Sequence, residues 1–446
     1  MSSPARPTPS QPPPVQPTPS QPTPLRHVPS RPTPLRHNRV ARTHLTGVWA
    51  NCLGGGVFDI ALPLIVLLST GSLAQMATIA IAQQVPKALP GLVVGGIVDR
   101  QPPRRMMLLG YLGQALVVAV IPVAMLLGIH SLVLLVAVAY VRGSLDMFAR
   151  TATFVAIPEM YGEDTPAFNA ALSTAWTSAA IIGPAVGGVL ATTIPPELLL
   201  TVDAASFLVM AYVVTRLPVP RSAPARAGAS SLAASLRAGY GYLLRMQGFG
   251  WFVATVVCVG CVYAPLGTLS LYTVSTVYHA SSTVVGLVSS AAAFGLFTGS
   301  LVAHRQATTA PRTIMLRGSA VMTLGALLFF VPHWGAVAAG IYVVCAGGVY
   351  WTVGRTTTMH TQVPKEHLGK SMTAIQFLET FIGPASVVTA ASVAERVGPR
   401  AAYGLVVGAS ALSGLFMLAA RALLEAPRLS RLVPVVDGGV VEGEAA

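Results

Sequence analysis

Four ionisable side chains lie inside long apolar stretches of the sequence, where a charge is costly unless it is paired or hydrated. Two are acidic, Asp59 and Glu379, and two are basic, Lys87 and Arg142. At a rise of 1.5 Å per helical residue, each lies about 12 to 18 Å from one end of its stretch. A carboxylate in a medium of low dielectric constant takes up a proton more readily than in water. These residues are therefore candidates for proton transfer or for lining a substrate cavity.

The depths of the four residues suggest how they pair. Asp59 and Lys87 lie at similar depth on consecutive stretches that run in opposite directions, so we expect an ion pair between them. Glu379 has no basic neighbour in the sequence, which favours it as the isolated proton carrier. A purely structural ion pair is the alternative for Asp59, Lys87 and Arg142. Asp203 lies near the end of its stretch, and we expect it at a helix end or at the membrane interface.

Three aromatic residues, Trp176, Tyr350 and Trp351, could present flat apolar faces to an amphipathic substrate. Their alternative role is to anchor helix ends at the membrane interface. No histidine has the spacing of a metal ligand, and all four cysteines fall in apolar stretches. Walker loops and nucleophile elbows are absent from the sequence. We therefore expect no metal, no cofactor and no enzymatic activity.

The elements that position these residues follow from composition. Of 446 residues, 53% are hydrophobic and 10% charged, whereas soluble proteins carry about 25% charged residues. This excludes a soluble enzyme. The apolar residues form runs long enough to cross a bilayer as helices, and we expect an all-α polytopic membrane protein with twelve spans, at residues 46–70, 75–98, 106–127, 132–152, 169–193, 198–216, 249–273, 283–303, 314–333, 335–354, 371–393 and 401–422.

The distribution of basic residues predicts the orientation of these spans. An even number of spans places both termini on one side, and nearly all Lys and Arg outside the spans lie on that side. The opposite loops hold only Arg396 and Arg400. By the positive-inside rule both termini are cytoplasmic. The net charge of +13 is thus topological, and we expect no nucleic-acid partner.

Motifs recur between the two halves of the chain at offsets of 200 to 205 residues. This indicates two six-helix bundles related by pseudosymmetry, with a substrate path between them. The matched motifs are Asp99-Arg100 with His304-Arg305, Arg150-Thr-Ala-Thr with Arg355-Thr-Thr-Thr, and Gly183-Pro184 with Gly383-Pro384. The predicted units are a Pro-rich cytoplasmic tail (1–45), a first bundle (46–216), a cytoplasmic linker with an amphipathic helix (217–248), a second bundle (249–422) and a second tail (423–446).

The loop from Gly95 to Arg105 resembles the Gly-x-x-x-Asp-Arg-x-x-x-Arg motif of the major facilitator superfamily. The resemblance covers about residues 45 to 422. It implies that a cytoplasmic charge cluster latches the two bundles, and the residues that match or could pair with it are Gly95, Asp99, Arg100, Arg104, Arg105, Asp146 and Arg150. Pro102 and Pro103 replace the usual Gly-Arg of the family.

A second motif, Gly183-Pro184-Ala185-Val186-Gly187-Gly188, resembles the signature of antiporters in this family. Small residues let membrane helices approach closely, and proline bends a helix and frees a backbone carbonyl. The family places two further glycines upstream, where this chain has Ala170 and Ala179. Together the motifs are similar to those of the 12-span exporters of drugs and natural products.

This resemblance implies a monomeric exporter in the bacterial inner membrane that moves small amphipathic molecules by alternating access. The proton gradient would supply the energy, with protons and the bilayer as its other partners. One alternative is a lipid or lysolipid flippase on the same fold, with Arg142 as a headgroup-binding residue. Another is a membrane scaffold that has lost transport, in which the Pro-rich tail is the working part.

Overall fold

A computed structural model describes residues 38–88, 101–219, 237, 240–245, 248–306 and 309–420. These residues form helices and no strands. Twelve α-helices run in the order α1 (Arg39–Thr70), α2 (Leu73–Ala88), α4 (Pro103–Leu126), α5 (Leu132–Tyr161), α6 (Thr165–Leu190), α7 (Pro196–Arg216), α9 (Phe249–Tyr272), α10 (Ser282–Arg305), α11 (Pro311–Leu327), α12 (Trp334–Gln362), α13 (Lys365–Val397) and α14 (Pro399–Ala419).

Length and hydropathy identify ten stretches of the described residues that could cross a membrane. One of them, Leu132–Leu190, contains both α5 and α6, and α2 has 16 described residues. Large apolar side chains on the outer faces are strongly exposed, such as Leu116 at 72% and Val133 at 77%. Exposure of this kind suits contact with lipid. The structure confirms the prediction of an all-α polytopic membrane protein.

Several helices extend beyond the apolar runs from which they were predicted. The clearest example is α5, which continues from the expected end at residue 152 to Tyr161. In the same way, α1 begins at Arg39 instead of residue 46, because the Asn38 side chain accepts hydrogen bonds from the Val40 and Ala41 N–H groups. Hydropathy marks where a helix leaves hydrocarbon, whereas caps and turns mark where it ends.

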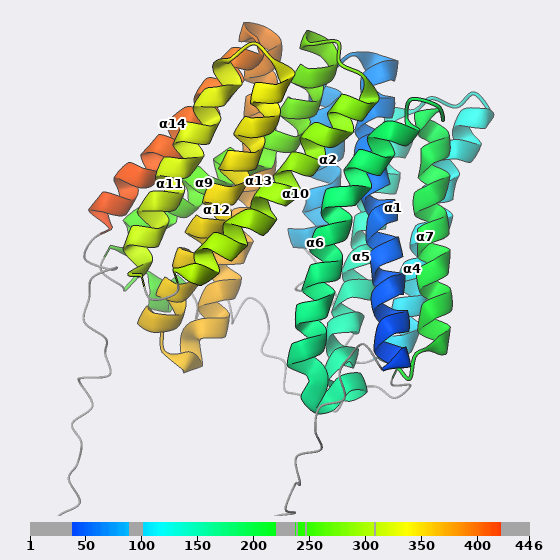
Figure 1. The fold of residues 1–446 in the computed structure, drawn as a ribbon, viewed down its shortest axis with the longest axis horizontal. Coiled ribbons are helices and arrows are strands. Elements are labelled where there is room, and N and C mark those ends of the chain that lie inside the picture. The colour runs from blue at the N-terminus through cyan, green and yellow to red at the C-terminus, as the bar shows by residue number, and fades with distance from the viewer. Residues whose placement is uncertain are drawn as a thin grey trace, which may run out of the picture.

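The helices pack as two bundles with the same internal arrangement (Figure 1). In the N-terminal bundle α1 packs on α6 and α7, α4 on α5 and α7, and α2 on α5. In the C-terminal bundle α9 packs on α13 and α14, α11 on α12 and α14, and α10 on α12. Each pair in one bundle has its counterpart six helices later. This repetition confirms the predicted pseudosymmetry.

Two helix pairs form most of the described contact between the bundles, α6 with α10 and α2 with α13, and α2 also contacts α9. Across the first seam, a Cβ atom on Gly188 would lie 2.8 Å from Gly286 Cα, so the two backbones are in direct contact. Across the second, Glu395 Oε1 accepts hydrogen bonds from Ser72 Oγ at 3.0 Å and from the Ala74 N–H at 2.8 Å. The Glu395 carboxylate therefore caps the N-terminus of α2 from the opposite bundle.

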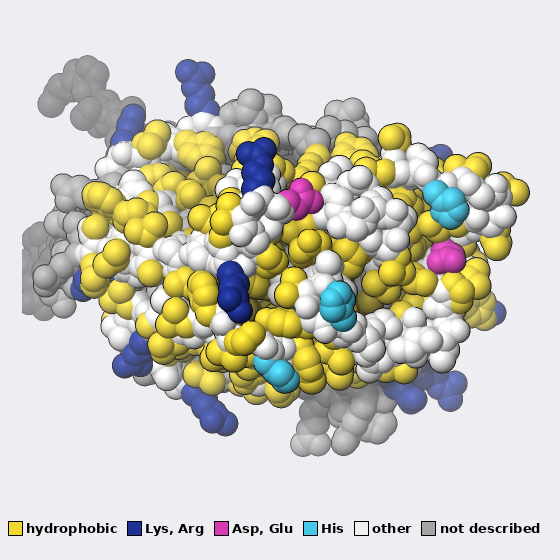
Figure 2. All heavy atoms as spheres, turned by 90° about the horizontal axis from the view of Figure 1, so that it is seen from above, with side chains coloured by type: hydrophobic (Ala, Val, Ile, Leu, Met, Phe, Trp, Pro, Cys, Tyr) yellow, Lys and Arg dark blue, Asp and Glu magenta, His cyan; other side chains and the backbone are white. Residues whose placement is uncertain are grey.

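We call the end of the molecule that contains Ser72 and Glu395 the junction end, and the opposite end, where α1 begins, the splayed end. From the junction end the bundles diverge toward the splayed end (Figure 1). Seen from above, the junction end has a mainly apolar surface on which only a few charged side chains are visible (Figure 2). Arg396 and Arg400, at the connection between α13 and α14, lie at this end. Their placement agrees with the charge pattern used to orient the spans.

Inside the N-terminal bundle, glycines set the spacing of α1 and α6. A Cβ atom on Gly56 would lie 2.7 Å from Gly183 Cα, and one on Gly183 would lie 2.9 Å from Gly56 Cα. Such distances leave no room for any side chain at either position. Close backbone approach at small residues is the usual basis of helix association in membranes.

A buried ion pair joins α5 to α7 in the same bundle. Arg142 Nε donates to Asp203 Oδ2 at 3.1 Å, and the Asp203 side chain is fully buried. The Arg142 guanidinium also lies 3.9 Å from the centre of the Phe58 ring. The expectation that Asp203 lies at a helix end or interface is therefore wrong. Asp203 pairs with a residue 61 positions earlier in the chain. Sequence spacing does not reveal a partner so distant.

The glycine crossing predicts a sharp difference between two neighbouring residues. Gly56→Ala should lower the free energy of unfolding by about 1–3 kcal/mol, because α1 and α6 must separate. Gly55→Ala should leave it nearly unchanged, since a Cβ there would meet Arg142 Nη2 at an ordinary 3.6 Å. Melting temperatures of the two variants in detergent measure the difference. Equal melting temperatures would show that the crossing tolerates a methyl group.

The buried ion pair predicts a second difference. Asp203→Asn should destabilise the protein by about 3–5 kcal/mol, because Arg142 is left charged and buried without its partner. Asp146→Asn is the matched control, since the exposed Asp146–Arg150 pair contributes about 0.5 kcal/mol or less. Thermal unfolding of both variants in detergent tests this, and similar losses in the two would contradict it. Joint replacement by Arg142→Met and Asp203→Leu should recover most of the stability.

Candidate functional site

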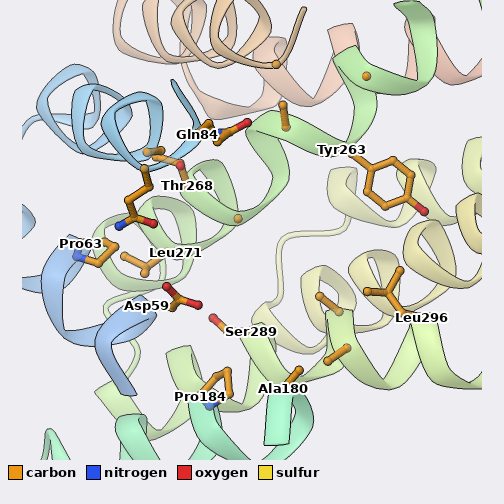
Figure 3. Close-up of a pocket in the computed structure, with 18 of the residues that line it drawn as sticks. Asp59, Pro63, Gln84, Ala180, Pro184, Tyr263, Thr268, Leu271, Ser289 and Leu296 are labelled. Carbon is orange, nitrogen blue, oxygen red and sulfur yellow. The ribbon is translucent and has the colours of Figure 1, made fainter. Parts of the chain in front are cut away.

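A cavity of about 760 Å³ lies between the two bundles. Helices α1, α2 and α6 form one wall, and α9, α10, α12 and α13 form the other. The size is that of pockets that bind drug-sized molecules. More than half of the wall is apolar, and polar side chains such as Asp59, Gln84 and Thr268 lie among the apolar ones (Figure 3). A cavity shared between bundles in this way is the expected place for a transported substrate.

The N-terminal wall carries the predicted residue Asp59. Its side chain is exposed to the cavity and, in the close-up, points to the same region as Ser289 of α10 (Figure 3). Gln83 and Gln84 of α2 add two amide groups. A Cβ atom on Gly383 of α13 would lie 2.9 Å from Gln84 Oε1. Gln84 therefore sits at the boundary where the two bundles meet.

The C-terminal wall carries an ion pair between the carboxylate of Glu379 on α13 and the guanidinium of Arg355 on α12. The Glu379 side chain keeps 34% of its surface exposed, and Arg355 keeps 13%. The Arg355 guanidinium also lies 5.9 Å from the centre of the Trp351 ring, one turn earlier on α12. The expectation that Glu379 is isolated is thus wrong, since its cation comes from a different helix.

Trp351 lies on the cavity wall, but the other two predicted aromatic residues do not. Trp176 packs edge-on against Phe154 at 5.8 Å and lies under the Arg150 guanidinium at 5.6 Å. The Tyr350 hydroxyl donates to Gln306 on a different face of the C-terminal bundle. Arg142, paired with Asp203, is not among the cavity residues either. The proposed cavity role of these three residues therefore has no support from their position.

Part of the predicted gating cluster can be placed. Arg104 Nη2 donates to the Thr215 carbonyl at 2.8 Å, which ties the start of α4 to the end of α7. Arg105 contacts Gln101 Oε1 at 3.4 Å, and Arg150 pairs with Asp146 at 3.4 Å within α5. Gly95, Asp99 and Arg100 lie outside the described residues, so the predicted latch stays a prediction. The side chain of Lys87 is not described either, and the Asp59–Lys87 pair also stays a prediction.

The antiporter motif contacts both bundles. Gly183 and Gly187 face α1, where a Cβ atom on Gly187 would lie 3.0 Å from Val57 Cα. Gly188 faces Gly286 of α10 in the other bundle, and Pro184 lines the cavity between these contacts. A short segment of α6 therefore packs inside its own bundle, contacts the opposite one and borders the substrate path.

Sequence reasoning missed several polar residues of the cavity, namely Gln83, Gln84, Thr268, Ser289 and Arg355. An uncharged polar residue in a span can face either a cavity or a neighbouring helix. The sequence alone does not distinguish these two positions. Arg355 had one signal: it lies four residues after Trp351, so the two share a helix face. From the sequence, Arg355 is identified only as the counterpart of Arg150 in the repeat.

The described residues of the site include groups that can bind a substrate and groups that can be ionised. They form no catalytic group of the kind that cleaves covalent bonds. Among the described residues, no group of three His, Cys, Asp or Glu side chains could hold a metal ion. Asp59 on one wall and Glu379 with Arg355 on the other are charges that a substrate or a proton can reach. Because the two walls belong to different bundles, any movement of one bundle against the other would change the separation of Asp59 from the Glu379–Arg355 pair.

Comparison with known proteins gives a matching family model, relatives in sequence and similar solved structures. The family model of the Major Facilitator Superfamily matches residues 45–386. The multidrug efflux pump Tap of Mycolicibacterium fortuitum is 26% identical over 367 residues, which cover 78% of this chain and 88% of that protein. Among solved structures, the nucleoside transporter NupG superposes with a TM-score of 0.67 at 12% identity, covering 87% of this chain and 100% of that one.

A bacterial homologue of the iron transporter ferroportin, in an inward-facing state, superposes with a TM-score of 0.68 at 14% identity, covering 86% of this chain and 99% of that one. At such identities the solved structures show a shared fold alone. The family model spans most of the chain and both bundles up to the middle of α13. This multi-pass membrane protein, a transporter and not an enzyme, belongs to the major facilitator superfamily.

Proposed function

We propose that this protein exports small amphipathic molecules across the bacterial cytoplasmic membrane in exchange for protons. It works as a monomer by alternating access, with both termini in the cytoplasm. The proton gradient is its energy source, and it needs no cofactor. The efflux function of its relative Tap supports the direction of transport, and the positive-inside pattern supports the orientation.

The ion pair of Glu379 and Arg355 on the cavity wall carries the proposal. A proton that reaches Glu379 removes its negative charge and thereby releases Arg355 from the pair. Loss of the proton restores the attraction. Because the two residues lie on α13 and α12, each proton changes the electrostatic contact between two helices of the cavity wall. Proton binding can then bias the conformation of the wall.

The contacts between the bundles suit a rocking motion. Among the described residues they lie mainly along the α6–α10 and α2–α13 pairs, and Glu395 accepts two hydrogen bonds across the junction end. With the predicted orientation, the splayed end faces the cytoplasm, so a substrate enters from that side. Rocking about the α6–α10 seam would break the Glu395 contact and open the cavity to the outside. There, protons at higher activity bind Glu379 and favour release.

The position of Arg142 does not support the flippase alternative. Arg142 was considered as a headgroup-binding residue, but its guanidinium is engaged by Asp203 and Phe58. The scaffold alternative depends on the Pro-rich tail, which lies outside the described residues. Deletion of residues 1–40 tests it: loss of biological function with transport intact would favour the scaffold.

Replacement of Glu379 tests proton coupling. In inside-out vesicles with an imposed pH gradient and a fluorescent pH probe, wild type should release protons when amphipathic compounds are added. Glu379→Gln should abolish this response, because the side chain can no longer be ionised. Glu163→Gln, at an exposed acid between α5 and α6, is the control and should respond like wild type.

If Glu379→Gln responds like wild type, the proton site moves to Asp59, and Asp59→Asn is the next variant. If folded, inserted wild type responds to no cation, neutral macrolide-like compound or anionic metabolite, the antiport proposal loses its support.

Replacement of Glu395 tests alternating access. Glu395→Ala removes the acceptor for Ser72 and Ala74 and should shift the population toward open junction ends by about tenfold, the equivalent of 1.4 kcal/mol. Spin labels at residues 129 and 400, one on each bundle, report this as a longer distance in pulsed electron paramagnetic resonance. Glu197→Ala, an acid at the same end of the molecule, is the control. Unchanged distance distributions in Glu395→Ala would exclude a latch at this position.

A further inference from the structure

A second cavity, of about 370 Å³, lies in the C-terminal bundle apart from the substrate path. It is a groove between α10, α11 and α12, and its lining residues recur at helical spacing along each of them. From α10 come Thr298, Gly299, Val302 and Gln306, from α11 Arg317 and Val321, and from α12 Tyr342, Ala346, Gly347 and Tyr350. The groove therefore runs along the helices for about two turns, or roughly 12 Å.

The floor of the groove is backbone. Gly299 lies where α10 crosses α12, and a Cβ atom there would come 2.5 Å from the Ala346 carbonyl oxygen. At the crossing of α11 and α12, a Cβ atom on Gly347 would lie 2.8 Å from the Met322 nitrogen. Neither residue places a side chain in the space, and Val302 and Val321 complete an apolar wall. A flexible hydrocarbon chain fits a groove of this shape and composition.

One end of the groove is polar and positively charged. Arg317 Nη1 donates to Gln306 Oε1 at 2.8 Å, and the Tyr350 hydroxyl donates to the same oxygen. Gln306 directly follows the last residue of α10, so the Arg317 guanidinium extends toward the membrane interface at the splayed end. Arg317 is exposed, and in the described part of the chain no carboxylate forms an ion pair with it.

We propose that this groove binds one anionic phospholipid from the leaflet at the splayed end. The phosphate contacts Arg317, and an acyl chain lies over Gly299 and Gly347. A guanidinium at the interface with no ion-pair partner among the described residues attracts a net negative headgroup, and the apolar floor adds a contact that free phosphate cannot make. The proposal is independent of proton coupling and of the transported substrate.

Native mass spectrometry of the full-length protein in neutral detergent tests the headgroup. Wild type should retain phosphatidylglycerol more strongly than phosphatidylethanolamine with the same acyl chains. Arg317→Gln should weaken phosphatidylglycerol retention about fivefold, the factor expected for one arginine at an anionic surface. Arg305→Gln is the matched control, because Arg305 is exposed at the end of α10 but does not line the groove.

A pair of tryptophan variants tests the groove itself. Val302 lines it and is 48% exposed, whereas the adjacent Leu301 is 50% exposed and does not line it. Val302→Trp should fill the space and displace the phospholipid, and Leu301→Trp should leave retention unchanged. Size-exclusion profiles confirm that both variants are folded.

Three results would overturn the proposal. Equal retention of the two phospholipids by wild type would exclude selection by charge. A similar loss in Arg317→Gln and Arg305→Gln would show attraction by the whole basic surface instead of this site. Displacement of phosphatidylglycerol by millimolar inorganic phosphate would assign the arginine to a free anion.

Discussion

The cost of a charge in hydrocarbon is the constraint on which the rest of this structure depends, because it determines where each ionisable side chain can lie. Arg142 satisfies this constraint inside the N-terminal bundle, where its guanidinium pairs with the fully buried Asp203. Arg355 meets it at the cavity wall, where its partner Glu379 keeps 34% of its surface exposed. The two pairs thus differ in the carboxylate, which is fully buried in one bundle and partly exposed in the other.

Close packing of backbones is the second organising feature. Lipid is as apolar as leucine, so membrane helices gain little from burying apolar side chains against each other and rely on close contact at small residues. Helix α6 uses Gly183 against α1 and Gly188 against Gly286 of α10. One segment therefore links the packing of the N-terminal bundle to the seam between the bundles. Pro184, between these two contacts, lines the cavity.

The two halves share an arrangement of helices but differ in chemistry at equivalent positions. Arg150 pairs with Asp146 one turn earlier on its own helix, partly exposed to solvent. Its counterpart Arg355 pairs across helices with Glu379 at the cavity. Pseudosymmetry preserves the path of the backbone, because the packing of helix pairs depends on shape. Side-chain chemistry is free to diverge, and the Glu379–Arg355 pair of the cavity between the bundles lies in the C-terminal half.

The sequence alone determined the fold class, the order of the spans and the division into two bundles, because hydrophobic length and repeated motifs are local properties. It also identified Asp59 and Glu379 as cavity residues. It could not supply the partners of buried charges, because such pairs join residues 24 and 61 positions apart. Tyr350 and Trp351 are neighbours, yet one faces a groove and the other the cavity. A helix turns about 100° per residue, so only the packing of neighbouring helices decided which of the two lines the cavity between the bundles.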